Sequence, residues 1–341
     1  MKRKSLLIVV VVLLLVSACS SQESTTLETI ATAKPEAEPL ATTFAVGDID
    51  KFNQNLSPIV KQLVEDYPDS YWWLLGDAGY GSRAEVRKNY SEITSVIPKG
   101  YIRMIYGDHD YGTQNPNKFT KENLVKTGAG EILSAQDTFM DTINNFGDLT
   151  VGFLPKEQTL QIATWKIVGI NDICVETDTI ENVDCDAQRF KDFEFFLKIP
   201  SQTKTCTIAM WHHPVFGVVK NGGNDEPGGE KYGTPLHEAA LENGVDIILN
   251  GDHHHFLATK PIDINGELVA DPNTPSARQF IVGTGGASYS LDLGTPRLPK
   301  EAIDSQIDGT VGVLKLELFT DYAQVTFISA KGPLYTTRVD C

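Results

Sequence analysis

The chain has 341 residues, of which 41% are hydrophobic and 22% charged, with a formal net charge of −16 at pH 7. This composition is that of an ordinary globular protein, and it excludes a wholly disordered, collagen-like or coiled-coil chain. The excess of acidic residues repels a phosphate backbone, so no nucleic-acid partner is expected, although a bound metal ion could still attract a small phosphorylated substrate.

The first residues predict export from the cytoplasm. A basic stretch at Lys2–Lys4 precedes an unbroken apolar run from Leu6 to Val16, which is too short to span a bilayer, since that takes about 20 residues. The run ends in Val16-Ser17-Ala18-Cys19, which resembles the bacterial lipobox, where the cysteine is lipidated and becomes the first residue. We predict a lipoprotein signal peptide over 1–18, a lipid anchor on Cys19, and a location in the bacterial cell envelope outside the cytoplasm; a plain secretory signal is the alternative.

A change of composition follows this leader. Residues 20–39 are rich in Ser, Thr, Glu, Ala and Pro and have almost no bulky apolar side chains, so they cannot bury enough surface to order themselves. We predict a flexible tether over 19–40. No repeat or second boundary follows, and residues 41–341 are expected to form a single domain.

Four short apolar segments are each followed directly by Gly-Asp, at Gly47-Asp48, Gly76-Asp77, Gly107-Asp108 and Gly251-Asp252. Such runs are typical of buried parallel strands. Apolar residues on one helical face of residues 51–67 separate the first two, which indicates a βαβ unit. Parallel strands end at one edge of their sheet, so the four carboxylates should converge there. Because clustered anions need a compensating cation, the pattern indicates a metal site.

Further strands are predicted over 165–170, 205–210 and 279–282. The C-terminal region reads as a hairpin of residues 311–319 and 323–329, since Leu314, Leu316 and Leu318 alternate with charged residues as in a half-buried strand.

Apart from Cys19 there are four cysteines, Cys174, Cys185, Cys206 and Cys341. An even number in an exported protein favours two disulfides, and the count leaves three connectivities open. Metal binding by these thiols is the alternative, but the sequence has no C-x-x-C motif.

The chemistry-bearing motifs occur in a recognisable order. Asp48 is followed by GDAGY (76–80), GDHDYG (107–112), WHHP (211–214) and NGDHHHF (250–256). In this order they resemble the calcineurin-like metallophosphoesterases, most closely the purple acid phosphatase branch. The resemblance extends to flanking segments and covers nearly all of residues 42–341. It implies a four-layer αββα sandwich, in which two mixed β-sheets are flanked by helices and metals lie at the C-terminal ends of the strands.

The resemblance implies two metal ions bridged by Asp77. The first would be bound by Asp48, Asp77, Tyr80 and His254. A phenolate together with two carboxylates suits Fe(III) at this position.

The second ion would be bound by Asp77, Asp108, His212 and Asp252, with His109 stabilising the transition state or protonating the leaving group. Two residues depart from the family pattern, because Asp108 replaces the usual Asn and Asp252 the usual His. The phosphatase-D-like branch has similar motifs. Three carboxylates and one imidazole favour a hard divalent ion, Ca²⁺, Mg²⁺ or Mn²⁺, over Zn²⁺.

The neighbouring polar residues are expected to support the site. Asp110 would orient its neighbours from outside the ligand set. Side chains alternate on an extended segment, so His213 should point away from the metal of His212 and either pack or contact substrate. His253 is expected to be structural or to lie at the rim of the site, and His237 to lie on the surface of a helix.

Two disulfides complete the expectations. The resemblance implies Cys174–Cys185, because similar family members have a matching pair, and we expect Cys206–Cys341 to pin the terminal hairpin to the strand that carries His212. The glycine-rich loop 221–229 either shapes access to the site or is an ordinary solvent loop.

The expected function is a metal-dependent phosphatase that hydrolyses small phosphate monoesters at the cell surface. No G-x-S-x-G motif is present, so water activated by two metal ions is the expected nucleophile. The same metals could serve a phosphodiesterase. A third alternative is a non-catalytic lipoprotein that keeps the fold for binding.

Overall fold

The structure is a computed structural model that describes residues 37–112, 165–170, 172, 191, 193–194, 197–198, 206–217, 233–288 and 298–341. The chain divides into two units, Met1–Ala37 and Glu38–Cys341, and the fold and site below belong to the second. The predicted signal peptide, Cys19, nearly all of the tether, Cys174, Cys185 and loop 221–229 lie outside the described residues.

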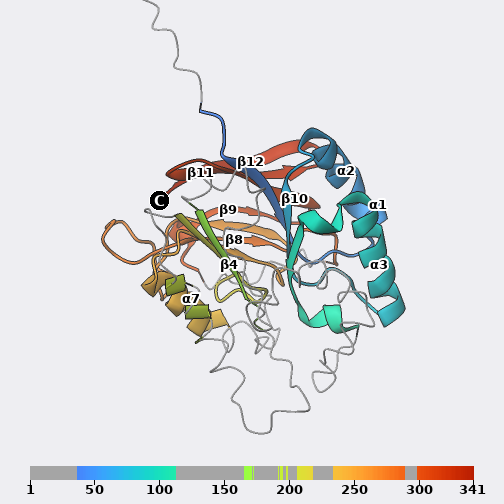
Figure 1. The fold of residues 1–341 in the computed structure, drawn as a ribbon. Coiled ribbons are helices and arrows are strands. Elements are labelled where there is room, and N and C mark those ends of the chain that lie inside the picture. The colour runs from blue at the N-terminus through green and yellow to red at the C-terminus, as the bar shows by residue number, and fades with distance from the viewer. Residues whose placement is uncertain are drawn as a thin grey trace, which may run out of the picture. The chain divides into compact units, whose positions relative to one another are not determined.

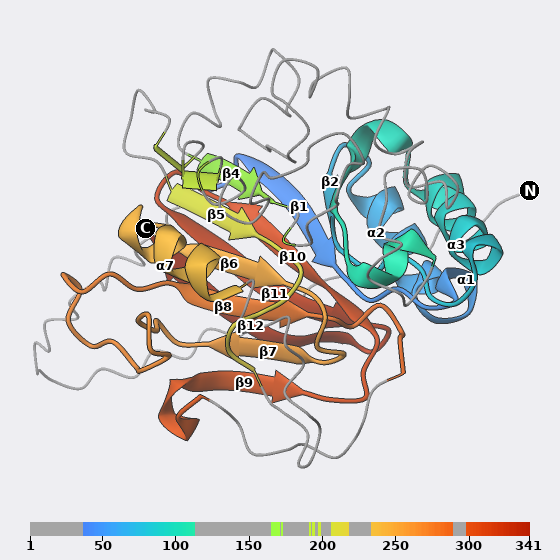
Figure 2. The same ribbon diagram turned by 90° about the horizontal axis from the view of Figure 1, so that it is seen from below.

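Twelve strands in the described part of the chain form two mixed sheets of six strands each (Figures 1 and 2). The first sheet has the order β12-β11-β10-β1-β2-β3. Strands β1, β2 and β3 are parallel to one another, whereas β10, β11 and β12 pair antiparallel. Its strands are β1 (Ala41–Val46), β2 (Tyr71–Leu75), β3 (Ile102–Ile105), β10 (Gly312–Leu318), β11 (Tyr322–Ser329) and β12 (Gly332–Asp340).

The second sheet has the order β4-β5-β6-β8-β7-β9. Its first four strands in that order are parallel, and β7 pairs antiparallel with both β8 and β9. Its strands are β4 (Trp165–Gly169), β5 (Cys206–Met210), β6 (Ile247–Asn250), β7 (Phe256–Thr259), β8 (Arg278–Val282) and β9 (Ile303–Ile307).

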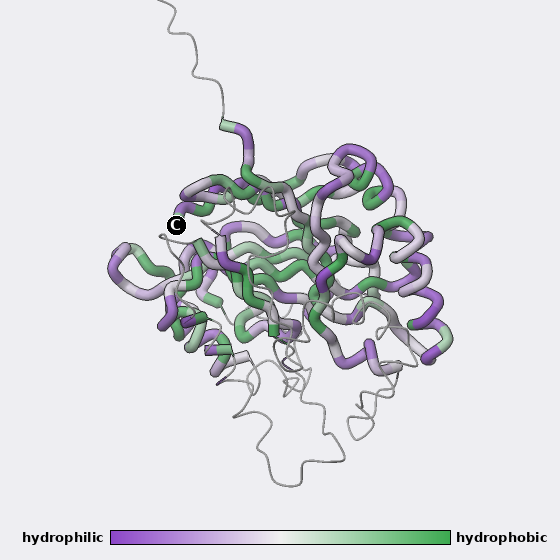
Figure 3. The backbone as a smooth tube through the Cα atoms, viewed as in Figure 1, coloured by the Kyte–Doolittle hydropathy of each residue, from purple (hydrophilic) through white to green (hydrophobic). Residues whose placement is uncertain are grey.

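The main hydrophobic core lies between the two sheets, and the strands that line it are the most hydrophobic part of the backbone trace (Figure 3). It joins Trp73 and Leu316 of the first sheet to Ile208 and Phe280 of the second. The rings of Phe256 and Phe327, one from each sheet, are stacked with centroids 4.4 Å apart. Burial of apolar surface on this scale is the main force that holds the two sheets together.

Helices cover the outer faces of both sheets. On the first sheet lie α1 (Phe52–Asn55), α2 (Ser57–Asp66) and α3 (Arg83–Val96), and on the second lies α7 (Thr234–Glu242). Short 3₁₀ turns occur at Lys99–Tyr101, Asp108–Tyr111 and Lys300–Ala302. No helix among the described residues is both long and apolar enough to cross a membrane.

The predicted fold, two mixed sheets between layers of helices, is confirmed, and so are the predicted strands, which correspond to β4, β5, β8, β10 and β11. The predicted helix over 51–67 is divided into α1 and α2 around Leu56. Pro58 stands in the first turn of α2, because proline suits the first turn of a helix but would interrupt the hydrogen bonds of a continuous one.

The terminal hairpin is a three-stranded meander, because β12 follows β11. Strand β12 was not predicted, because only Val339 of that strand is buried and the apolar alternation that marks a half-buried strand is missing. The predicted Cys206–Cys341 disulfide is present and ties the end of this meander to the first residue of β5.

Candidate metal centre

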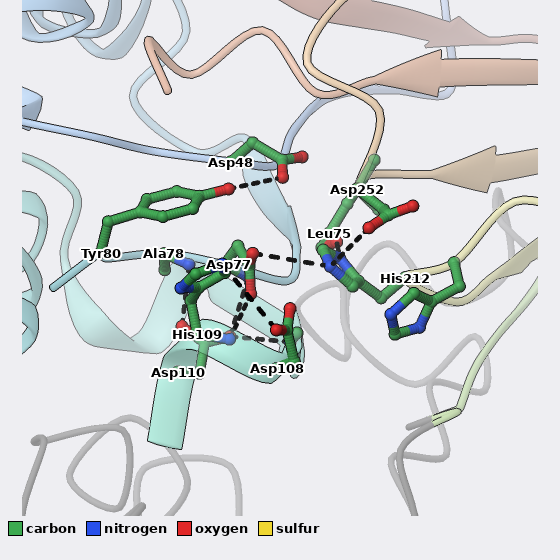
Figure 4. Close-up of polar contacts among 12 residues, drawn as sticks. Asp48, Leu75, Asp77, Ala78, Tyr80, Asp108, His109, Asp110, His212 and Asp252 are labelled. Atoms are coloured by element: carbon green, nitrogen blue, oxygen red, sulfur yellow. Dashed lines mark hydrogen bonds and ion pairs between the residues drawn. The ribbon is translucent and has the colours of Figure 1, made fainter. Parts of the chain in front are cut away.

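The four Gly-Asp pairs meet where the two sheets come together, and their carboxylates face a common space (Figure 4). Asp48, Asp77 and Asp108 follow β1, β2 and β3 of the first sheet, while Asp252 follows β6 of the second. The predicted convergence therefore occurs, but across two sheets rather than at the edge of one. Backbone hydrogen bonds join the sheets at this point, among them Gly47 N–H to Val282 O (2.9 Å).

Three of the glycines in this arrangement have no room for a side chain. A Cβ on Gly107 would lie 2.0 Å from Asp77 Oδ1, one on Gly76 would lie 2.3 Å from His212 Nδ1, and one on Gly251 would lie 2.5 Å from Leu75 O. Contacts under 3 Å force a neighbour to move, and here the neighbours include the site residues themselves. The glycines before Asp77, Asp108 and Asp252 thus let the strand ends approach closely.

Three of the four aspartates have a left-handed backbone, with φ of 59° at Asp48, 51° at Asp77 and 65° at Asp252. Aspartate and asparagine tolerate this region better than most residues. Such conformations cost free energy and persist where the surrounding structure requires them. Here they turn each carboxylate out of its strand direction and into the shared space.

Tyr80 and His254 gather around Asp48. The Tyr80 hydroxyl donates to Asp48 Oδ1 (2.8 Å) and lies 2.9 Å from His254 Nε2. His254 Nδ1 donates to Ser288 O (2.6 Å). Burial lowers the pKa of His254, but the hydrogen bond and charge of Asp48 outweigh it and raise that pKa to about 9. The Tyr80 hydroxyl proton and a ring proton of His254 thus lie among the ligand atoms of Asp48, Tyr80 and His254. A cation bound by these three residues would replace those protons.

Asp77 lies at the centre of the second group of residues. Its Oδ2 is 3.7 Å from His212 Nε2, and its Oδ1 accepts the backbone N–H of His109 (2.9 Å). His212 Nε2 is also 4.0 Å from Asp252 Oδ1, and His109 Nε2 is 3.8 Å from Asp108 Oδ2. All the residues that the sequence assigned to the two metals therefore lie together in the structure.

The electrostatics of the site are unfavourable without a cation. Burial raises the pKa of Asp77 well above its usual range, and the charges of Asp108, Asp48 and Asp110 raise it further. The ion pairs that Asp48, Asp77, Asp108 and Asp252 make with other described residues all involve histidines, never Lys or Arg. A divalent or trivalent ion would supply the missing positive charge.

Two buried atoms identify where such an ion fits. Asp48 Oδ2 and His212 Nε2 are both buried and have no hydrogen-bond partner, although burying an unpaired polar atom costs about 1–3 kcal/mol. His212 donates its other ring nitrogen to Leu75 O (2.7 Å), the usual arrangement of a metal-binding histidine. Ligand atoms of Asp48, Asp77 and His212 lie within 4.8 Å of one another, and so do those of Asp77, Asp108 and His109.

Asp110 ties together the loops after β2 and β3. Its buried carboxylate accepts the backbone N–H groups of Asp77 (2.9 Å), Ala78 (2.8 Å) and Gly107 (2.9 Å) and the Tyr90 hydroxyl (2.8 Å). These contacts hold the backbone of the central aspartate in place, which agrees with the orienting position predicted for Asp110.

Asn89 of α3 holds the loops after β1 and β2 in the same way, a role that was not predicted from the sequence. Its amide donates to Ile49 O and Ala78 O (both 2.8 Å), and its oxygen accepts the Phe52 N–H (2.8 Å). The only sequence signal was a polar residue between the buried Val86 and Ile93 on one face of the helix.

The position of His213 differs from the one predicted by alternation along an extended segment. Residues 211–217 bend after β5 ends, so the alternation expected of an extended segment does not apply. The rings of His212 and His213 lie 4.8 Å apart, nearly perpendicular to each other. His213 Nδ1 is 2.9 Å from Asp172 Oδ2. Asp172 was also missed, although a carboxylate just beyond β4 repeats the strand-end placement of the other aspartates.

The other histidines occupy three environments. His253 Nε2 is 3.6 Å from Asp252 Oδ2, which places it beside the site. His255 lies behind it, with the two rings stacked at 5.7 Å. The expected surface position of His237 is wrong, because its side chain is buried against Phe216, and burial lowers its pKa to about 4.

The sequence of residues 41–256 matches the profile of the calcineurin-like phosphoesterase family. The chain belongs to this family. Its members use a dinuclear metal site, which agrees with the clusters of aspartate and histidine described above. Membership of a phosphoesterase family supports a hydrolase that acts on phosphoester bonds. A search of curated proteins found no match.

Solved structures with the same fold have low sequence identity to the chain. A purple acid phosphatase from yellow lupin (Lupinus luteus) seeds is 15% identical over 88% of this chain, with a TM-score of 0.59. The chain spans about half of that protein, 53% of its length. PhoD is 11% identical, with coverage of 90% of this chain and 70% of its own and a TM-score of 0.52.

A third neighbour is GAP50, described as the anchor in the inner membrane complex of Plasmodium. It is 13% identical, with coverage of 88% of both chains and a TM-score of 0.53. At these identities the likeness establishes the fold alone.

Proposed function

We propose that this chain hydrolyses phosphate monoesters with two metal ions, at the surface of a bacterial cell. The observation that supports this most directly is that Asp48 Oδ2 and His212 Nε2, both close to the carboxylate of Asp77, are buried without a hydrogen-bond partner. Such atoms are expected where a cation completes the site.

The residues divide into two ligand sets that share Asp77. Asp48, Tyr80 and His254 would complete the first, and Asp108, His212 and Asp252 the second. Bound cations neutralise the oxygens of a phosphate ester and lower the pKa of water, which is the chemistry that a phosphoesterase needs.

The position of His109 suits a general acid. Its backbone N–H donates to Asp77, its ring lies 4.4 Å from that of Tyr80, and its Nε2 is 3.8 Å from Asp108 Oδ2. The side chain is about a quarter exposed, at 24%, so it can reach a bound substrate. We assign it the protonation of the leaving oxygen, a contribution of about 10²–10⁴-fold for a well-placed acid.

The identities of the metals follow from the ligand chemistry. A tyrosinate oxygen beside carboxylates suits Fe(III) at the Tyr80 site. Three carboxylates and one imidazole suit a hard divalent ion, Ca²⁺, Mg²⁺ or Mn²⁺, at the site of Asp108 and Asp252. A visible tyrosinate–Fe(III) absorption band that is lost in Tyr80→Phe and disturbed in His254→Ala would support the first assignment.

The proposed location has two supports. The leader ends in a lipobox-like sequence at Cys19, and the Cys206–Cys341 disulfide is of the kind that persists in oxidising compartments. Cys19→Ser should leave the precursor uncleaved or misprocessed. Unchanged migration and fractionation of that variant would rule out the lipid anchor.

The decisive experiment compares an aryl phosphate monoester with the corresponding diester, using metal-loaded protein and metal-free protein as the control. We expect metal-dependent release of phosphate from the monoester at the higher rate. Faster hydrolysis of the diester would make the protein a phosphodiesterase. Metal binding without turnover of either ester would instead indicate a binding lipoprotein.

A further inference from the structure

His213 lies beside the predicted ligands, next to His212 in the chain, but belongs to neither of the two ligand sets. Its side chain is mostly buried, at 11% exposed. Ligand atoms of Asp108, His212 and His213 lie within 4.8 Å of one another, a spacing that a single cation can bridge. His213 comes from the bend after β5, whereas Asp108 follows β3 of the other sheet.

The orientation of His213 is fixed from behind. Asp172 Oδ2 accepts the backbone N–H of His213 (2.7 Å) and lies 2.9 Å from its Nδ1. Because a carboxylate oxygen accepts, Nδ1 donates its proton to Asp172, and Nε2 is the ring nitrogen through which His213 would bind a cation.

This is the arrangement in which proteins present a histidine to a metal. A metal-binding imidazole usually donates its other N–H to a carboxylate or a backbone carbonyl. His212 uses the carbonyl of Leu75 (2.7 Å) and His213 the carboxylate of Asp172 (2.9 Å). In both adjacent histidines Nδ1 thus faces an oxygen acceptor, and the nearby His212 Nε2 is buried without a hydrogen-bond partner.

We propose that His213 is an additional ligand of the second metal ion, together with Asp108 and His212. This inference rests on the dinuclear centre of the proposed function and changes its second site. A second imidazole makes the site softer than three carboxylates and one imidazole would be, which moves its preference away from Ca²⁺ and Mg²⁺ toward Mn²⁺ and Zn²⁺. Asp172 is then a positioning residue, which acts on the metal through His213.

The test is metal binding by the mature protein, measured without any substrate. Metal-free wild type, His213→Gln and the matched control His255→Gln are titrated with Zn²⁺ and with Ca²⁺ by calorimetry. His255 lies in the neighbouring segment but in none of the clusters of three or more possible metal ligands among the described residues. We expect His213→Gln to weaken binding of the second Zn²⁺ by at least about tenfold, to weaken Ca²⁺ binding less, and the control to match wild type.

A spectroscopic count separates a ligand from a residue that only supports the fold. In Mn²⁺-loaded protein, pulsed electron paramagnetic resonance detects directly bound imidazole nitrogens. His213→Gln should lose one such nitrogen, whereas Asp172→Asn should weaken binding while the nitrogen count stays the same.

The inference is wrong if His213→Gln keeps both the Zn²⁺ affinity and the nitrogen count of wild type. It is equally wrong if the variant binds metals normally and only its inhibition by inorganic phosphate is weakened, since His213 would then contact substrate. Wild-type protein that binds two metals through His213 but hydrolyses no ester would contradict the proposed function and leave this inference standing.

Discussion

The carboxylates at the two ends of the parallel strands in the second sheet have different partners. At the end where β8 begins, Arg278 pairs with Asp304 and donates to the Tyr335 hydroxyl (2.9 Å) and to Thr337 Oγ1 (2.8 Å). The Cys206–Cys341 disulfide closes the same end. At the other end, Asp252 lies with three more carboxylates around histidines, and Asp48 Oδ2 and His212 Nε2 are buried without a hydrogen-bond partner.

The difference shows how one fold separates stability from function. At the disulfide end, the Arg278 guanidinium pairs with the Asp304 carboxylate and a covalent bond joins the two sheets. This end therefore stabilises the sandwich without a metal ion. The metal end accumulates negative charge, left-handed aspartates and unpaired atoms, all of which cost free energy until a cation binds. Substitutions at the disulfide end should therefore lower the stability of the protein and leave its activity unchanged. Substitutions of the carboxylates at the metal end should lower activity and raise the stability of the metal-free protein.

The largest effect is expected from Asp77→Asn. Removing the shared carboxylate should weaken both metals and lower phosphatase turnover by at least about 10³-fold, equivalent to about 4 kcal/mol of activation free energy. In the metal-free protein the same change should be stabilising, because it removes a buried, repelled negative charge. Steady-state kinetics and thermal unfolding of the metal-free form measure the two effects.

The pH dependence of the stability of the metal-free protein tests whether the buried charge of Asp77 is destabilising. Its folded pKa lies above the ordinary value of 3.8, so in the metal-free protein its contribution to stability is present below pH 3.8 and is lost as the pH rises through the raised pKa. Asp77→Asn should remove this decline. If wild type and variant lose stability in parallel across that range, Asp77 is not the group responsible.

Next in size is the effect of removing the disulfide. A double Cys206→Ser and Cys341→Ser variant should lose about 2–4 kcal/mol of unfolding free energy, because the bond constrains a chain segment of 135 residues in the unfolded state. Turnover at a temperature where the variant is folded should change little. Denaturant unfolding measures the first effect. A large loss of turnover in the folded variant would show that the two ends are coupled.

Asp252→Ala should have a smaller effect, confined to the second metal, with binding weakened by at least about tenfold, equivalent to 1.4 kcal/mol. Asp252→His restores the usual residue of the family and should shift the preference further toward Zn²⁺ with some activity kept. Elemental analysis and phosphatase assays separate these cases. Unchanged metal content and turnover in Asp252→Ala would reduce Asp252 to a turn residue.

The smallest effect is expected from Asp304→Asn. The pair with Arg278 is partly exposed, with 29% of the Asp304 side chain accessible, and such pairs contribute about 0.5–1 kcal/mol. The loss should shrink at high salt, because screening weakens exposed charges. The metal content of Asp304→Asn should match that of wild type. A measurable drop in metal content would show that changes at the disulfide end affect the metal site.

Most of the strands and of the site could be predicted from the sequence because their signals are local. An apolar run followed by Gly-Asp marks both a buried strand and the carboxylate after it, and this pattern located Asp48, Asp77, Asp108 and Asp252. Edge strands such as β9 and β12 have no such signal, because most of their residues are partly exposed or exposed.

The residues that position the site depend on contacts far apart in the chain. Asp172 meets His213 across 41 residues, and Asn89 meets Ile49 across 40. Nothing in the local sequence of Asn89 distinguishes an organising polar residue from an ordinary buried one, and the position of Asp172 just beyond β4 does not reveal that its partner is His213. The bend that brings His213 beside His212 likewise follows from where β5 ends, which the alternation rule could not anticipate.

The family, the strand-end carboxylates and the histidines of the metal site can be read from the sequence, because each is encoded in a few neighbouring residues. The folded structure was needed to show that these groups come from two sheets, which of their atoms lack a hydrogen-bond partner, and which carboxylate holds which histidine. Those properties depend on how the sheets approach each other, and that approach is set by the shared hydrophobic core and by the absence of side chains at Gly76, Gly107 and Gly251.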